Sequence, residues 1–193
     1  MRCGVLALQG DWAAHAAQLR ALGVETVWVR TAAELDEVDA LVLPGGESTA
    51  MLKLMEAEDL APKIGDRIAA GMPVLATCAG VILLAREISP PQASLGLLDV
   101  DVERNAYGRQ VHSRVAEVRL SEELGKPDRI EGVFIRAPRI TRVGAGVTIL
   151  ARRDDDVVLV RQGPIIAATF HPELTGDDRV HRLLMDEEAR HGR

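Results

Sequence analysis

Cys78 is the side chain of this sequence best placed to act as a nucleophile. It lies between an apolar strand-like run at residues 74–76 and an apolar helix-like run at residues 81–85, joined through small residues. This pattern predicts a tight strand-to-helix turn, which presents a side chain at the carboxyl end of a sheet. A helix start also favours an anion, and the thiolate is the attacking form of cysteine. The alternative is an inert buried thiol, because free cysteines are often buried.

His171 and Glu173 are the candidates to activate such a thiol. They belong to the segment Phe-His-Pro-Glu-Leu at residues 170–174, which follows the last predicted strand. On an extended backbone, residues two apart point to the same side, so the carboxylate could orient the imidazole while the other ring nitrogen faces Cys78. This arrangement is that of a catalytic triad. Taken alone, His-Pro-Glu is more typical of a turn.

A loop at residues 44–48, Pro-Gly-Gly-Glu-Ser, follows the predicted strand at residues 40–43. Gly45 and Gly46 would let a backbone N–H approach a developing oxyanion, and the N–H of Ala79 would supply a second donor. Taken alone, Gly-Gly is typical of a loop and Glu-Ser-Thr of a helix N-cap. Because loops at the carboxyl ends of parallel strands converge, the three segments together favour one shared site.

The elements that must position these loops alternate in the first half of the chain. The apolar patterns predict strands at residues 5–8, 26–29, 40–43 and 74–76, and helices at residues 12–22 and 50–70. Continuous apolar strands separated by helices predict a parallel sheet covered on both faces. Right-handed crossovers then make an α/β fold with a doubly wound, mostly parallel sheet.

The second half of the chain changes to short β-rich runs. These predict strands at residues 97–102, 115–120, 132–135, 147–150, 157–161 and 165–170, followed by a helix at residues 178–190. We expect these strands to form an antiparallel β extension of the sheet. No repeat or linker divides the chain, so we expect a single domain over residues 1–193.

Composition excludes several classes of function. The chain has 23 basic and 29 acidic residues, a net charge of −6, and no basic tract, which argues against a nucleic-acid partner. No apolar stretch is long enough for a membrane helix, so we expect no membrane association and a cytoplasmic protein. Cys3 and Cys78 are too few for a disulfide framework or a zinc cluster, and Cys3 is expected in the core.

Several motifs together resemble a known enzyme family. They are Gly-Val-Leu-Ala-Leu-Gln-Gly at residues 4–10, Leu-Pro-Gly-Gly-Glu-Ser-Thr at 43–49, Thr-Cys-Ala-Gly at 77–80, Val-Glu-Arg-Asn at 102–105, Phe-Ile-Arg-Ala-Pro at 134–138 and Phe-His-Pro-Glu-Leu-Thr at 170–175. The chain thereby resembles the class I, or triad, glutamine amidotransferases. Within them it is similar, over nearly its whole length, to the glutaminase subunits of pyridoxal 5′-phosphate synthase, the PdxT family.

This resemblance implies a flavodoxin-like class I amidotransferase fold and the hydrolysis of L-glutamine to glutamate and ammonia. Cys78, His171 and Glu173 would be catalytic, and the N–H groups of Gly46 and Ala79 would form the oxyanion hole. By family position, the glutamine-binding residues would be Gly46, Glu47, Ser48, Arg104, Ile135 and Arg136. On residue type alone, the two arginines could instead form surface ion pairs. The ammonia would pass to a separate synthase subunit that makes pyridoxal 5′-phosphate, and neither a cofactor nor a metal is implied.

The sequence departs from the family pattern at two positions. Ala76 stands where relatives often have glycine, which adds a tolerable methyl group near the turn. His112 stands where relatives often have an acidic residue, and we interpret it as a surface residue rather than a metal ligand. The remaining histidines, His15, His181 and His191, lie on helical or terminal segments and are expected to be solvated.

Two other functions stay open. The chain could be the glutaminase subunit of a different class I amidotransferase, with the same chemistry at Cys78 but another synthase partner. It could also be a flavodoxin-like binding or redox-sensing protein in which Cys78 is oxidised and nothing turns over. Recognition of glutamine would separate an amidotransferase from a sensor.

Overall fold

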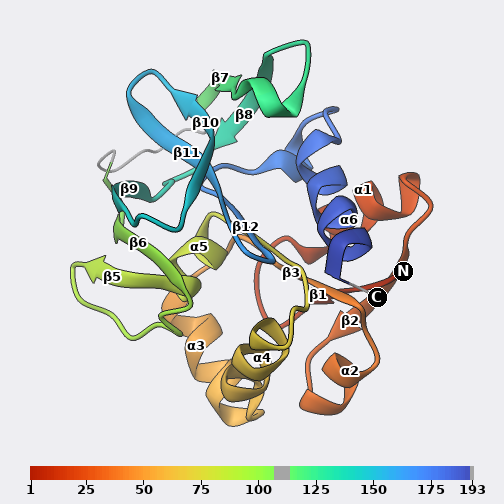
Figure 1. Ribbon diagram of the computed structural model, residues 1–193. Coiled ribbons are helices and arrows are strands. Elements are labelled where there is room, and N and C mark those ends of the chain that lie inside the picture. Colours follow the sequence, from red (N-terminus) through yellow and green to blue (C-terminus); the bar gives the residue numbers. More distant parts are fainter. Residues whose placement is uncertain (107–113, 192–193) are drawn as a thin grey trace.

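A nine-stranded mixed sheet runs through the molecule (Figure 1). The computed structural model describes residues 1–106 and 114–191. Five neighbouring strands are parallel, in the order β2 (Glu25–Val29), β1 (Arg2–Leu6), β3 (Ala40–Leu43), β4 (Val74–Thr77) and β12 (Ile165–Ala168). Four antiparallel strands extend the sheet from β12, in the order β11 (Asp156–Gln162), β10 (Thr148–Arg153), β7 (Arg114–Leu120) and β8 (Arg129–Phe134). The predicted α/β fold class is confirmed.

Two hydrophobic clusters cover the two faces of the sheet. Alternate residues of one strand point to opposite faces, so Leu41 and Leu43 join one cluster whereas Val42 joins the other. The first cluster also includes residues of α2 (Ala32–Asp36), α3 (Ser48–Ala57), α4 (Leu60–Ala69) and α5 (Ala79–Leu84). The second includes residues of α1 (Trp12–Ala21) and α6 (Arg179–His191). The sheet is therefore covered by helices on both sides, as the continuous apolar strands predict.

A smaller sheet of three strands packs beside the main one. It consists of β5 (Ala85–Ser89), β6 (Leu98–Glu103) and β9 (Arg139–Val143), with β5 and β6 parallel and β6 and β9 antiparallel. The prediction that residues 97–102 belong to the antiparallel extension is wrong. The strands at residues 85–89 and 139–143 were not predicted. β5 follows an apolar helical run without a break, and β9 has an arginine at two of its positions, which is typical of a solvated segment.

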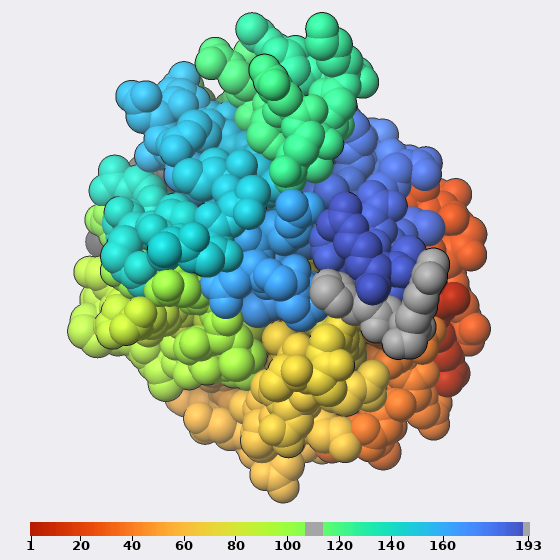
Figure 2. All heavy atoms as spheres, viewed as in Figure 1, coloured from red at the N-terminus to blue at the C-terminus, as the bar shows by residue number. Residues whose placement is uncertain are grey.

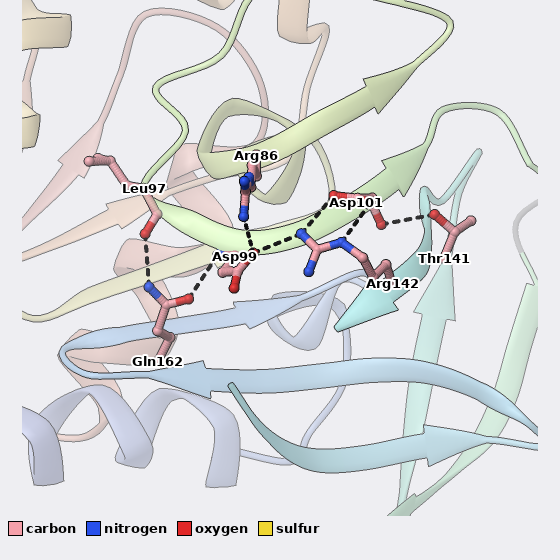
Figure 3. Close-up of polar contacts among 7 residues, drawn as sticks. All are labelled: Arg86, Leu97, Asp99, Asp101, Thr141, Arg142 and Gln162. Atoms are coloured by element: carbon pink, nitrogen blue, oxygen red, sulfur yellow. Dashed lines mark hydrogen bonds and ion pairs between the residues drawn. The ribbon is translucent and has the colours of Figure 1, made fainter. Parts of the chain in front are cut away.

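A polar network ties this small sheet to the large one (Figure 3). Arg142 of β9 forms ion pairs with Asp99 and Asp101 of β6, with nitrogen to oxygen distances of 2.7 Å. Gln162 of β11 accepts the backbone N–H of Asp99 and donates to the carbonyl of Leu97, at 2.8 and 3.1 Å. This network holds β6, and hence Arg104 directly after it, in a defined place relative to the main sheet.

On the molecular surface, α6 lies near the N-terminal half of the chain, and the β extension forms a separate region (Figure 2). In the space-filling view, the C-terminal helix α6 lies against N-terminal segments, and the β7–β8 region projects from one end of the molecule (Figure 2).

The sequence prediction missed helix α2, which begins at a capping box made by Thr31 and Glu34. Within the described residues, no helix is long and apolar enough to cross a bilayer.

Candidate active site

Cys78 occupies a strained turn between β4 and α5. Its backbone has φ 48° and ψ −104°, a left-handed conformation that is rare for residues other than glycine. The turn is held by the Cys78 N–H, which donates to the carbonyl of Ala168 on β12 at 2.8 Å. A Cβ at Gly80 would lie 2.3 Å from the carbonyl oxygen of Leu43, so the small residue is required by this close approach. The predicted strand-to-helix turn is present.

His171 and Glu173 meet directly beside this turn. The His171 Nδ1 and Glu173 Oε1 atoms are 2.6 Å apart, and both residues are buried. Because a carboxylate only accepts hydrogen bonds, Nδ1 carries the proton and donates it. The expected extended backbone is wrong: Pro172–Leu174 forms a short 3₁₀ turn, η2, and the contact is made across that turn. The N–H of His171 donates to the carbonyl of Val133 at 2.9 Å, which fixes the turn to β8.

The charge state of His171 reflects a balance between burial and its two partners. Burial lowers its pKa, but hydrogen bonds and charge interactions with Cys78 and Glu173 outweigh that effect and raise the pKa to about 10. At neutral pH the imidazole therefore favours the protonated form whenever the thiol is ionised. The structure brings together the three residues that the sequence predicted as a triad, and it pairs them in the order Cys78, His171, Glu173.

The glycine loop packs onto the same group. A Cβ at Gly45 would lie 2.4 Å from His171 Cε1 and 3.3 Å from Cys78 Cβ, so only glycine fits there. The Gly45 carbonyl oxygen points at Gly10, where a Cβ would approach it to 1.8 Å. Since the N–H and C=O of a trans peptide point in opposite directions, the N–H of Gly46 is turned away from Gly10.

Glu47 and Arg104 approach each other beside this loop. Glu47 follows β3 of the large sheet, and Arg104 follows β6 of the small sheet. Arg104 Nη2 is 3.8 Å from Glu47 Oε1, and the Glu47 side chain also caps α3 by accepting from the N–H groups of Thr49 and Ala50. Partial burial raises the Glu47 pKa, but these hydrogen bonds and Arg104 lower it more, so the carboxylate is ionised at neutral pH. Gln9 Oε1 accepts the Glu47 N–H at 2.6 Å.

Ser48, Ile135 and Arg136 complete the set of predicted binding residues. Ser48 is buried, and its hydroxyl donates to Gln92 Oε1 at 3.0 Å. The Ile135 carbonyl oxygen lies 3.9 Å from the sulfur of Cys78, which places this backbone next to the nucleophile. Arg136 has φ 46° and is exposed, and the described residues include no ion-pair partner for it. Of these three residues, Ile135 is the one in contact with the thiol, and Arg136 is the most exposed.

Two histidines were placed wrongly by sequence reasoning. His15 and His181 were expected to be solvated, but both are completely buried behind the triad. The available signal was helical spacing, since His15 shares the stripe of Trp12 and Leu19. His112 lies outside the described residues, as does the side chain of His191.

The second cysteine behaves as predicted. Cys3 is fully buried in β1, and burial, with a smaller contribution from Asp39, raises its pKa to about 12. A thiol of this kind stays protonated and packs as a small apolar side chain. The two cysteines thus have different environments, and among the described residues an imidazole, that of His171, interacts with Cys78.

Comparison with known proteins identifies the family of this chain. The model of the SNO glutamine amidotransferase family matches residues 5–189. The chain belongs to this family. Pyridoxal 5′-phosphate synthase subunit PdxT of Thermotoga sp. (strain RQ2) is 52% identical to this amidotransferase over 187 residues, which cover 96% of this chain and 98% of the relative. The PdxT subunit of Mycolicibacterium smegmatis is 50% identical over 189 residues, covering 95% and 96%.

A solved structure agrees with these relatives. A crystal structure described as glutamine amidotransferase superposes on this amidotransferase with a TM-score of 0.90 and 45% identity, covering 97% of this chain and 98% of that chain. The resemblance predicted from the sequence motifs is confirmed, and so is the class I amidotransferase character of the fold.

Proposed function

We propose that this amidotransferase is the glutaminase subunit of a pyridoxal 5′-phosphate synthase, and that it hydrolyses L-glutamine to L-glutamate and ammonia. The observation that carries the proposal is the buried contact series Cys78, His171 and Glu173 beside the Gly45–Gly46 loop. The family membership supports the same reaction, as do the PdxT relatives, whose sequences are 50% to 52% identical to this one over nearly the whole chain. We place the activity in a single domain and in the cytoplasm.

The arrangement supports acyl transfer through a thioester. The Cys78 thiolate adds to the side-chain amide carbon of glutamine, and the N–H groups of Gly46 and Ala79 stabilise the oxyanion. The His171 imidazolium then protonates the amide nitrogen, which leaves as ammonia. Neutral His171 next takes a proton from water, whose oxygen attacks the thioester, and glutamate and the thiolate are released. Glu173 keeps the proton of His171 on Nδ1 and stabilises the imidazolium.

Glutamine recognition follows from charge. The Glu47 carboxylate suits the α-amino group of the substrate, and Arg104 and Arg136 suit the α-carboxylate, since planar guanidinium groups bind carboxylates through paired hydrogen bonds. Arg104 and Glu47 already lie 3.8 Å apart, so they can bind the two oppositely charged groups on one carbon. The remaining contacts are assigned to Ser48 and to the backbone at Gly46 and Ile135.

The product ammonia is assigned to a synthase subunit. The PdxT relatives are named as subunits of pyridoxal 5′-phosphate synthase, and the family match spans residues 5–189. A glutaminase of this kind is expected to be nearly idle alone and to gain activity on docking. The Gly45–Gly46 peptide is the element we expect to move, because glycine peptides reorient at little steric cost.

The decisive experiment follows nitrogen. Glutamine labelled on its amide nitrogen is supplied to the chain with and without the synthase subunit, in competition with unlabelled ammonium. We expect the glutaminase rate to rise on adding the synthase and the label to enter pyridoxal 5′-phosphate. Full activity of the isolated chain with complete dilution of the label would leave only a free glutaminase.

A second measurement addresses the sensor alternative. A glutamine-analogue electrophile should alkylate Cys78, and glutamine should block this reaction. A redox sensor has no reason to recognise that amino acid, so alkylation that glutamine leaves unchanged would favour the sensor.

A further inference from the structure

A cluster of buried polar groups lies next to the triad, in contact with Glu173. We call it the rear cluster, and it consists of His15 from α1, Thr77 from the end of β4, Glu173 from η2 and His181 from α6. The two histidine side chains and the Glu173 side chain are completely shielded from solvent. Buried polar groups are costly unless they are paired, so such a group of them calls for a role.

His15 is the centre of the rear cluster. Its Nδ1 atom is 3.0 Å from His181 Nε2, and its Nε2 atom is 3.1 Å from the Thr77 hydroxyl and 3.2 Å from Glu173 Oε2. One imidazole therefore contacts the residue before the nucleophile and the third member of the triad. Glu173 uses its other oxygen, Oε1, to bind His171.

The arrangement selects one tautomer for each histidine. If Nδ1 of His15 held the proton, its Nε2 lone pair would face the Glu173 carboxylate, and His181 would carry its own proton on Nδ1. That Nδ1 atom is buried and has no hydrogen-bond partner among the described residues. With the proton on Nε2 of both rings, His181 donates to His15, and His15 donates toward Thr77 and Glu173. Only a lone pair is then left unpaired on His181, which costs less than a buried N–H.

Both histidines are neutral in this environment. Burial is the main cause that lowers the pKa of His15 well below its ordinary value, and His181 and His171 add to it. Burial also lowers the pKa of His181 to about 4, against a smaller opposing effect of Asp178. A neutral His15 can donate one N–H toward Glu173 without cancelling the carboxylate charge that His171 requires.

We propose that His15 is a positioning residue of the amidotransferase: its Nε2–H, oriented by His181, holds Glu173 Oε2 so that Oε1 stays on His171 Nδ1. The inference rests on the proposed function and names a residue that acts through Glu173. Glu173 Oε2 is buried and forms no hydrogen bond of good geometry within the described residues. The His15 Nε2 atom, which bonds Thr77, lies 3.2 Å from this oxygen, so its N–H can stabilise the carboxylate electrostatically although it is not aligned on Oε2. The same N–H also approaches Thr77, which links the imidazole to the strand end that carries Cys78.

Two substitutions of His15 separate the role from simple packing. An asparagine amide reaches about as far as Nδ1 of histidine, whereas a glutamine amide reaches about as far as Nε2. His15→Asn therefore keeps a polar contact with His181 but leaves Glu173 without a donor, and His15→Gln keeps a donor near Glu173. In the complex with the synthase subunit, we expect His15→Asn to lower kcat about 10- to 100-fold with KM for glutamine within about twofold. His15→Gln should recover most of that loss.

Leu19→Val is the matched control. Leu19 is also fully buried on α1, one turn away from His15, and belongs to the hydrophobic cluster on that face. It should lower the melting temperature and leave kcat and the pH profile unchanged.

The pH profile depends on the titratable groups that face His15. These are Glu173 and His171 from the turn at η2 and His181 from α6, and Asp178 acts on His181. In His15→Asn we expect the acid limb of the kcat profile to move.

Nitrogen NMR of the unaltered chain tests the inference without any variant. Imidazole nitrogen shifts should report protonated Nε2 and unprotonated Nδ1 for both His15 and His181 at neutral pH. A proton on His15 Nδ1 would overturn the proposal, as would a His15→Asn variant with normal kcat and pH profile, or one that His15→Gln does not improve. If the unaltered complex had no glutaminase activity, the proposed function would fail instead, and the NMR result would still report the tautomers.

Discussion

Two polar networks of this molecule are built from similar groups but lie in opposite environments. In the rear cluster and the adjoining triad, the side chains of His15 and Glu173 are 0% exposed. In the network that joins the small sheet to the large one, Arg142 and Asp99 are 40% and 37% exposed (Figure 3). The distances are alike, between 2.6 and 3.2 Å for the contacts of Glu173 and 2.7 Å for that of Arg142. Burial, and not contact distance, is the main difference between them.

This difference determines what each network can do. Water screens the exposed ion pairs, so they hold the small sheet in place while contributing little stability each. The buried groups have no water to replace a lost partner, so removal of one leaves another desolvated and changes its protonation. Contacts between polar side chains thus form a structural link at the surface and set proton positions in the interior.

The largest effect is expected where the buried network ends at the nucleophile. Cys78→Ala should bind glutamine without hydrolysing it, because no other side chain there can form the thioester. Ammonia release by the variant bound to its synthase should fall by at least about a thousandfold. Cys3→Ser is the control, since Cys3 packs in β1 away from the site, and turnover should be nearly intact. Ammonia release within tenfold of normal in Cys78→Ala would make the triad assignment wrong.

Glu173→Gln tests charge against shape inside the buried network. The amide keeps the size of the side chain but not its charge, so the variant should fold and bind glutamine. Turnover should fall by about ten- to ten-thousandfold, because the His171 imidazolium loses its stabilising partner. Steady-state kinetics with the synthase present measure the loss. Unchanged kinetics would reduce His-Pro-Glu to an ordinary turn.

Acid should destabilise the interior in a defined window. Burial lowers the folded-state pKa of His181 to about 4. Between about pH 6.5 and pH 4, His181 is therefore protonated in the unfolded chain but not in the folded chain. Stability from this residue is present above pH 6.5 and falls by about 3 kcal/mol as pH drops through that window. Urea unfolding of the unaltered chain and of His181→Gln at pH 7 and pH 4.5 should show a smaller acid loss in the variant. Equal losses would mean that His181 does not titrate in this range.

His171 has the opposite sign and does not obscure that window. Its folded-state pKa is raised to about 10, so the stability it contributes is fully present below about pH 6.5 and is lost as pH rises toward 10. Acid and alkaline unfolding therefore report different histidines of one buried network.

The smallest effect is expected in the exposed network. Asp101→Asn removes one partner of Arg142, which retains Asp99 and remains in water. The melting temperature should fall by about 2 °C or less, and the difference should shrink in high salt because the pair is screened. Glutamine turnover should be unchanged unless the end of β6 shifts. A large, salt-independent loss of stability would remove the distinction between the two networks.

Sequence reasoning reached the site more fully than the fold around it. Cys78, His171 and the Gly45–Gly46 loop stand at strand ends with local patterns that a single sequence shows, and the structure brings them together. The parallel pairing of β1, β3 and β4 also agrees with the prediction from apolar runs separated by helices, whereas their order in the sheet was not predicted. The pairing of β12 with β4 brings distant segments together, and local patterns give no direct measure of such contacts.

The elements that escaped prediction had weak or misleading local signals. β5 follows α5 directly, and its sequence Ala-Arg-Glu-Ile-Ser has no strand-like apolar pattern. His15 and His181 are polar residues on apolar helix faces, and residue type outweighed helical position in the interpretation. The contact of His15 with Glu173 comes from a turn far along the chain, which local patterns do not show.

The position of β12 has a consequence for the chain while it is being synthesised. β12 is one of the last elements made, yet it lies between β4 and β11 and carries the chain into His171 and Glu173. Until it emerges from the ribosome, β4 has one open edge and the thiol of Cys78 has neither imidazole nor carboxylate beside it. A chain interrupted before β12 therefore lacks both triad partners of Cys78 and leaves an edge of β4 unpaired, so we expect it to be inactive and prone to aggregation.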